Sequence, residues 1–146
     1  MRIAIVSTPE EIARLAADRI EEVYRSKPDF VLGLATGSSP ICLYDELVRR
    51  YEAGEISFAK VRSYNLDEYV GLPKDHFEGY MNFIRRHLVG RVDMPEGAAH
   101  GPDGWCEDLD EGARLYDEAI KAEGGIDIQV LGIGSDGHIG FNEPGG

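Results

Sequence analysis

The sequence is poor in cysteine, in long apolar runs and in basic residues. Cys42 and Cys106 are its only cysteines, which excludes a disulfide framework, and neither has the closely spaced partner that a zinc site needs. No apolar run approaches the length of a membrane span, and the first residues do not have the pattern of a signal peptide. We therefore expect a cytoplasmic protein with two ordinary thiols and no membrane partner.

The charge of the chain is strongly negative. Basic residues number 15 against 27 acidic ones, and the formal net charge is −12. A surface of that sign repels nucleic acid, so we expect no nucleic-acid partner, and a phosphate ligand would have to be bound by local donors against the overall field. The composition is otherwise that of a globular protein, and residues 1–146 have the length of one domain.

Segments typical of strands and of helices alternate along the chain. Apolar runs predict strands at residues 2–6, 30–35, 58–64 and 126–131. Helical periodicity and capping residues predict helices at residues 9–26, 40–53, 76–89 and 107–122. This alternation is typical of an α/β fold with a doubly wound, mainly parallel open sheet of the Rossmann type. No helix follows the fourth strand, so the sheet looks truncated there.

Polar residues follow three of the predicted strands. They lie at residues 36–39, 65–69 and 136–143. Because the carboxyl ends of parallel strands lie at one edge of a sheet, these three segments are expected to form a common site.

The first of these segments is Thr36, Gly37, Ser38 and Ser39, followed by the start of a predicted helix at Pro40. Hydroxyl groups and unpaired amides at a helix N-terminus suit a phosphate group. The alternative is an ordinary capped turn, because Ser and Gly are also favoured there for local reasons. The segment is not a P-loop, since no lysine follows at the required position.

The second segment places Asp67 and Glu68 just after a strand. Neighbouring side chains in extended backbone point to opposite sides, so Asp67 could face the site as a general base while Glu68 faces away. Two solvated loop acids are the alternative, and the spacing alone favours it.

The third segment contains Asp136, His138 and Glu143. Residues two apart share a side in extended backbone, so Asp136 can orient the imidazole, and Glu143 can fold back towards it. The alternative is a lone loop histidine among solvated acids. The same segment satisfies G-x-G-x-x-G, but neither a helix start nor a ribose-binding acid follows, which argues against a dinucleotide site. The histidines and cysteines show no metal-binding spacing, and we expect no metal.

Three motifs resemble those of the glucosamine-6-phosphate deaminase (glucosamine-6-phosphate isomerase) family. They are LATGSSP at residues 34–40, NLDEYVGL at 65–72 and GIGSDGHIGFNEP at 132–144. The resemblance extends over the whole chain, which is similar to the N-terminal portion of the family. Ser39 stands where family members often carry Thr, which keeps the hydroxyl group.

The resemblance implies the conversion of glucosamine 6-phosphate and water into fructose 6-phosphate and ammonia without a cofactor, as a hydrolase acting on an amino sugar phosphate in N-acetylglucosamine catabolism. It also implies roles for individual residues. His138, Asp136 and Glu143 would open the sugar ring, Asp67 would move a proton from C2 to C1, and residues 36–39 would bind the phosphate.

The resemblance also implies that this single sugar-phosphate isomerase/deaminase domain lacks its C-terminal part, since family members continue beyond Gly146 with further strands, a lid and basic residues. If the chain is complete, we expect weak substrate binding and little turnover. A related 6-phosphogluconolactonase and a non-catalytic sugar-phosphate-binding fragment remain as alternative functions, and assembly into a homo-oligomer is open.

Overall fold

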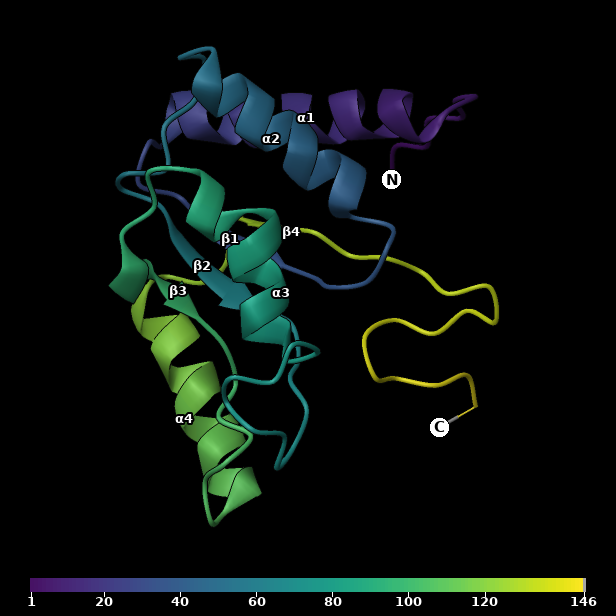
Figure 1. Ribbon diagram of the computed structural model, residues 1–146. Helices are drawn as coiled ribbons and strands as arrows, with labels where there is room; N and C mark the ends of the chain where they lie inside the picture. The colour runs from purple at the N-terminus through teal and green to yellow at the C-terminus, as the bar shows by residue number, and fades with distance from the viewer. Residues whose placement is uncertain (146) are drawn as a thin grey trace.

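Four short strands form one parallel sheet at the centre of the structure, a computed structural model that describes residues 1–145 (Figure 1). The strand order is β3-β2-β1-β4. Every neighbouring pair is parallel, with Val31 opposite Arg62 and Leu34 opposite Asn65 in the central pair. The predicted α/β fold with a parallel open sheet is therefore confirmed. The strands are β1 (Val31–Leu34), β2 (Arg62–Asn65), β3 (Ala99–His100) and β4 (Ile128–Gln129).

Four α-helices connect and cover these strands. Helices α1 and α2 cross each other, whereas α4 lies apart from them, next to β3 (Figure 1). Helix α3 lies between the α1–α2 pair and the loops at the lower end of the view. The helices are α1 (Pro9–Ser26), α2 (Ile41–Glu52), α3 (Tyr80–His87) and α4 (Leu109–Ala122), with 3₁₀ turns η1 (Val89–Arg91) and η2 (Glu96–Ala98). No helix among residues 1–145 combines the length and the apolar character that crossing a membrane requires.

Helix α1 begins and ends where its local sequence predicts. The Thr8 hydroxyl accepts a hydrogen bond from the amide of Glu11, and Pro9 occupies the first helical position, where a missing N–H has no cost. Its predicted apolar stripe is only partly buried, because Ile20 is buried while Ile12 is 59% exposed.

The hydrophobic core lies between the sheet and the helices. The apolar stripe predicted for α2 is confirmed at Leu43, Leu47 and Val48, which are buried, whereas its fourth residue, Tyr51, is partly buried; Tyr44, outside the predicted stripe, is buried too. They pack against β1 residues and against Phe58, which precedes β2. Both central strands are buried for nearly their whole length, and their carboxyl ends are thereby held in fixed positions.

The predicted strand at residues 2–6 is wrong. This segment contains no strand, and Ile3 and Ile5 are 76% and 95% exposed. Strand propensity expresses how well a side chain fits against neighbouring strands, and no strand of residues 1–145 pairs with this segment. The strand predicted at 58–64 is shorter and shifted, because residues 58–61 form a turn in which the amide of Val61 donates to the carbonyl of Phe58. The strand predicted at 126–131 pairs only at Ile128–Gln129.

Two predicted helices differ from those observed. Helix α3 begins four residues later than predicted, after a turn in which the amide of Gly79 donates to the carbonyl of His76. Helix α4 has the predicted extent to within two residues, but Leu109 and Leu115, two of the residues expected to face inward, are 45% and 52% exposed. Residues 90–106, for which no strand or helix was predicted, contain the two-residue strand β3.

Candidate active site

The three polar segments line one cavity of about 520 Å³. The walls include residues 36–39 after β1, Asp67 after β2 and His138 after β4, together with side chains of α3. The structure thus brings together the segments that the sequence predicts to converge. The roles assigned to the individual residues stay predictions at this point.

Tyr44 fixes the residue that precedes the segment at residues 36–39. The Tyr44 hydroxyl donates to the carbonyl of Ala35, and the amide of Ala35 donates back to the hydroxyl at 3.1 Å. Burial raises the pKa of Tyr44, which keeps it a donor. Gly37 has a φ of +100°, which glycine adopts without strain.

Unpaired backbone donors gather on this segment. The amides of Gly37, Ser38 and Ser39 donate to no acceptor within residues 1–145, and Pro40 gives α2 no side-chain cap. These N–H groups and the positive end of the α2 dipole form a place that can hold an anion.

Asp67 is half-buried at the wall of the cavity. Burial raises its pKa, and the negative charge of Glu68 raises it further. The segment after β4 passes directly over this carboxyl group, because a Cβ atom on Gly140 would lie 3.1 Å from Oδ2 of Asp67. The segment after β2, which carries Asp67, and the segment after β4, which carries His138, are therefore in contact.

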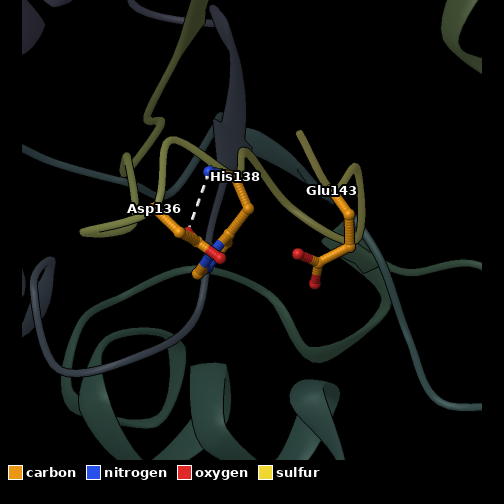
Figure 2. Close-up of side chains that lie close together, drawn as sticks. All are labelled: Asp136, His138 and Glu143. Carbon is orange, nitrogen blue, oxygen red and sulfur yellow. Dashed lines mark hydrogen bonds and ion pairs between the residues drawn. The ribbon is translucent and has the colours of Figure 1, made fainter. Parts of the chain in front are cut away.

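Asp136 and His138 form the expected pair. Oδ1 of Asp136 lies 2.6 Å from Nδ1 of the imidazole and also accepts a hydrogen bond from the His138 amide at 3.2 Å. These hydrogen bonds hold the pKa of Asp136 below its ordinary value. Figure 2 shows Glu143 beside this pair, with its carboxylate on the side of His138.

Asp136, His138 and Glu143 offer ligand atoms that lie within 4.8 Å of one another. This is the one group among residues 1–145 with three metal-binding side chains so close together. A tetrahedral zinc site with bonds of about 2.0–2.1 Å has ligand atoms about 3.3 Å apart. Nδ1 of His138 already binds Asp136, so the arrangement suits a hydrogen-bonded proton relay more closely than a preformed metal site.

The glycines of this segment place the imidazole. A Cβ atom on Gly134 would lie 2.2 Å from the His138 ring, so only glycine leaves room for the ring. The amide of Gly134 donates to the carbonyl of His138 at 2.8 Å, and Gly137 has a φ of +92° in the turn between them. The G-x-G-x-x-G pattern therefore reflects a tight turn around a histidine.

The cavity is also lined by side chains that were not predicted as site residues, among them Tyr69, Tyr80 and Arg86. The rings of Tyr69, Tyr80 and Phe141 pack together, with centroids 4.8 to 5.7 Å apart. Burial raises the pKa of Tyr80. Arg86 is the only basic side chain among the described residues that line the cavity, and its guanidinium lies 3.8 Å from the ring centroid of Phe77. The spacing of Tyr80, Phe83 and Arg86 along one helix could have indicated a common face.

The chain matches the family described as "Glucosamine-6-phosphate isomerases/6-phosphogluconolactonase" over residues 7–140. The chain belongs to this family. It is 55% identical over 145 residues to a glucosamine-6-phosphate deaminase of Mycolicibacterium smegmatis, covering 99% of this chain and 56% of that protein. It is 47% identical to glucosamine-6-phosphate deaminase 2 of Bacillus subtilis, covering 99% of this chain and 58% of the relative.

A solved structure of a monomeric glucosamine-6-phosphate deaminase matches with a TM-score of 0.94 at 38% identity, covering 99% of this chain and 60% of that one. A 6-phosphogluconolactonase from Thermotoga maritima matches with a TM-score of 0.79 at 20% identity, which shows a shared fold alone. The resemblance drawn from the three motifs is thus confirmed. The term hydrolase was inaccurate, since the family description names isomerases. The chain spans little more than half the length of the curated relatives it matches.

Proposed function

We propose that this protein converts glucosamine 6-phosphate and water into fructose 6-phosphate and ammonia. The observation that carries the proposal is that Asp67 and His138 line the same cavity as the unpaired amides at residues 36–39. A phosphorylated sugar that is anchored at those amides has a base and an imidazole within the same enclosure. The reaction would belong to the cytoplasmic breakdown of amino sugars such as N-acetylglucosamine.

The phosphate group binds first in this scheme. The N–H groups of residues 37–39 donate to its oxygens, and the dipole of α2 stabilises its negative charge. Arg86 supplies a positive charge at the same cavity. These local donors offset the net charge of −12 on the whole chain, which opposes anion binding.

Ring opening is assigned to His138. Its Nδ1 is engaged by Asp136 at 2.6 Å, which leaves Nε2 as the nitrogen that exchanges a proton with the sugar. Asp136 carries the negative charge that stabilises an imidazolium, since its lowered pKa keeps it ionised. Glu143 provides a second carboxylate beside His138 (Figure 2).

Isomerisation is assigned to Asp67. Its carboxylate removes the proton from C2 of the open-chain sugar and returns it to C1, while the aldehyde oxygen takes up a proton and the nitrogen gives one up, so that C1 becomes a CH₂OH group and the C2 amine becomes an imine. Water then adds to C2 and ammonia leaves. The raised pKa of Asp67 strengthens it as a base, because a carboxylate with greater proton affinity accepts a carbon-bound proton more readily.

The test offers the purified protein glucosamine 6-phosphate and 6-phosphogluconolactone in parallel assays for ammonia, fructose 6-phosphate and acid. We expect ammonia and fructose 6-phosphate in equal amounts from the amino sugar, and loss of both products in Asp67→Asn. The exposed Asp75→Asn, which removes a neighbouring charge outside the cavity, is the matched control. Acid from the lactone without ammonia would assign a lactonase, and sugar-phosphate binding without either product would assign a binding module.

A further inference from the structure

Glu68 lies next to the proposed base but faces away from the cavity. Its Oε1 accepts hydrogen bonds from the amides of Tyr69 at 2.9 Å and Tyr80 at 3.0 Å, and its Oε2 accepts from the amide of Met81 at 3.1 Å. Tyr80 and Met81 are the first two residues of α3, and the preceding Gly79 has no side chain that could cap the helix. The carboxylate of Glu68 therefore takes the place of a helix cap from a distant part of the chain.

The segment that carries Asp67 has few other hydrogen bonds. It is fixed before the base by the amide of Leu66, which donates to the carbonyl of Leu34 at 2.9 Å, and after it by the amide of Gly71, which donates to the carbonyl of Gly104 at 2.9 Å. Between these two points, the amide of Tyr69 and the first two amides of α3 donate to Glu68, and the Tyr69 ring packs on the Tyr80 ring with centroids 4.8 Å apart. Glu68 thus joins the backbone of residues 67–70 to the first turn of α3.

We propose that Glu68 is the positioning residue of this site: by binding the first amides of α3, it fixes the backbone beside it and directs Asp67 into the cavity. Asp67 lines the cavity and Glu68 does not, so anchoring Glu68 at α3 leaves Asp67 on the side that faces the substrate. This inference rests on the proposed function, in which Asp67 is the base. Glu68 itself touches no substrate.

Glu68 also affects the charge state of its neighbour. Burial raises the pKa of Asp67 most, and the Glu68 carboxylate adds to the increase. The other titratable groups that line the cavity with Asp67 are Tyr69, Glu78, Tyr80, Arg86 and His138. Because the amides of α3 bind the Glu68 carboxylate, its negative charge remains beside the base.

Two substitutions separate charge from geometry. Glu68→Gln keeps the length of the side chain but loses the charge, and its NH₂ group meets the Met81 N–H as a second donor. Glu68→Asp keeps the charge but is one methylene too short to reach the α3 amides. Asp75→Asn serves as the control, because it removes an exposed carboxylate from the neighbouring turn without touching either group.

The first experiment measures carboxyl titration of Asp67 and amide hydrogen exchange of Tyr80 and Met81 by NMR in the 146-residue chain. We expect a lower pKa of Asp67 in both variants, through lost charge in Glu68→Gln and through exposure of Asp67 to water in Glu68→Asp. Exchange at Met81 should become about tenfold faster or more in both, since 1.4 kcal/mol corresponds to a factor of ten. Asp75→Asn should change neither quantity.

An unchanged pKa of Asp67 in Glu68→Asp, together with fast exchange at Tyr80 and Met81, would show that Glu68 caps α3 without positioning the base, and would overturn the proposal. Loss of the folded amide spectrum in both variants would overturn it as well, because Glu68 would then support the whole fold. None of these readouts requires turnover, so they stand even if the proposed reaction is not found.

A kinetic experiment completes the test in the preparation that releases ammonia. Glu68→Asp should lower kcat about tenfold or more while KM changes by less than about twofold, because misplacement of the base affects the proton transfer and leaves the phosphate segment intact. A loss confined to KM would contradict the positioning role. Absence of ammonia from the unsubstituted protein would refute the proposed function and leave the NMR result to decide the role of Glu68.

Discussion

The pKa values of two carboxyl groups of the site, Asp67 and Asp136, are shifted in opposite directions. Asp67 is half-buried, and its pKa is raised by burial and by Glu68. Asp136 is exposed, and hydrogen bonds from His138 lower its pKa. Environments that separate the proton affinities of two acids usually mark different tasks. Asp67 is suited to accept a proton, and Asp136 is suited to remain charged beside an imidazole.

This difference predicts the effect of Asp136→Asn. The amide can accept the hydrogen bond from Nδ1–H of His138 but lacks the charge that stabilises an imidazolium, and it can also turn its NH₂ group towards the ring. We expect kcat for ammonia release to fall about 100-fold and both neutral tautomers of His138 to be detected by ¹⁵N NMR. A variant that keeps full kcat would show that the 2.6 Å contact has no part in ring opening.

A second residue-scale prediction concerns Gly134. In Gly134→Ala the new methyl group would lie 2.2 Å from the His138 ring, so the ring must move and the contact with Asp136 must lengthen. Gly132→Ala is the matched control, because a Cβ atom there meets nothing within 4 Å. We expect the His138 ring signals to shift in Gly134→Ala only, with the unfolding midpoint changed by a few degrees at most. Equal shifts in both variants would contradict this account.

Strands β1, β2 and β4 each deliver one segment to the cavity, and of these three β4 has the shortest pairing with its neighbour. It pairs with β1 at two residues only. Asp127, just before it, adds two links: its carboxylate accepts from the amide of Val31 at 2.8 Å and from Nζ of Lys27 at 2.9 Å. This one side chain therefore ties β4 to β1 and to the end of α1, which steadies the segment that follows β4.

The pH dependence of stability should reveal this link. The amide of Val31, followed by Lys27, lowers the pKa of Asp127 below its unfolded value. A lowered folded-state pKa contributes stability that is fully present above the unfolded pKa and is lost as the pH falls through the folded one. Asp127→Asn should cost about 1.5 kcal/mol or more in urea unfolding at pH 7, and the difference should shrink below about pH 4. The exposed Asp29→Asn is the control, and a difference independent of pH would refute the prediction.

The same scale shows what a sequence can predict. The start of helix α1 was predicted closely because its capping residues, Thr8 and Pro9, are local. The start of α3 was wrong because its first amides bind Glu68, twelve residues before the helix begins, and no local pattern signals such a partner. The strand at residues 2–6 failed for a related reason, since a strand exists only where another one pairs with it.

The candidate site could be predicted from the sequence to a similar extent. Polar segments that follow parallel strands lie at the same edge of the sheet, so the cavity could be predicted from the positions of these segments after the strands. The hydrogen bond between Asp136 and His138 followed from their spacing. Arg86 and Tyr80 were missed because they face the cavity from the side of α3, and Tyr69 was missed because its ring packs on Tyr80, so the places of all three depend on how α3 packs.

At the scale of the whole molecule, an apolar groove is exposed to solvent next to α1. A groove of about 370 Å³ runs between α1 and β4, and its lining is mostly apolar. Leu131 and Ile12 border this groove and are 54% and 59% exposed. The matched relatives are considerably longer than this chain, which is 56% of the length of the relative from Mycolicibacterium smegmatis.

The open groove predicts how the 146-residue polypeptide behaves by itself. It should bind the dye ANS, and it should self-associate at high concentration. In both cases apolar surface of the groove is removed from water, by the dye or by a second copy of the chain. The double variant Ile12→Ser, Leu131→Ser should lower ANS fluorescence about twofold or more, and it should leave the unfolding free energy within about 0.5 kcal/mol, since both side chains are already largely exposed. Leu109→Ser on α4, which is 45% exposed far from the groove, should leave the fluorescence unchanged. Equal dye binding by the unsubstituted chain, the double variant and Leu109→Ser would show that the groove is covered in solution. A large loss of stability in the double variant would also show that it is covered.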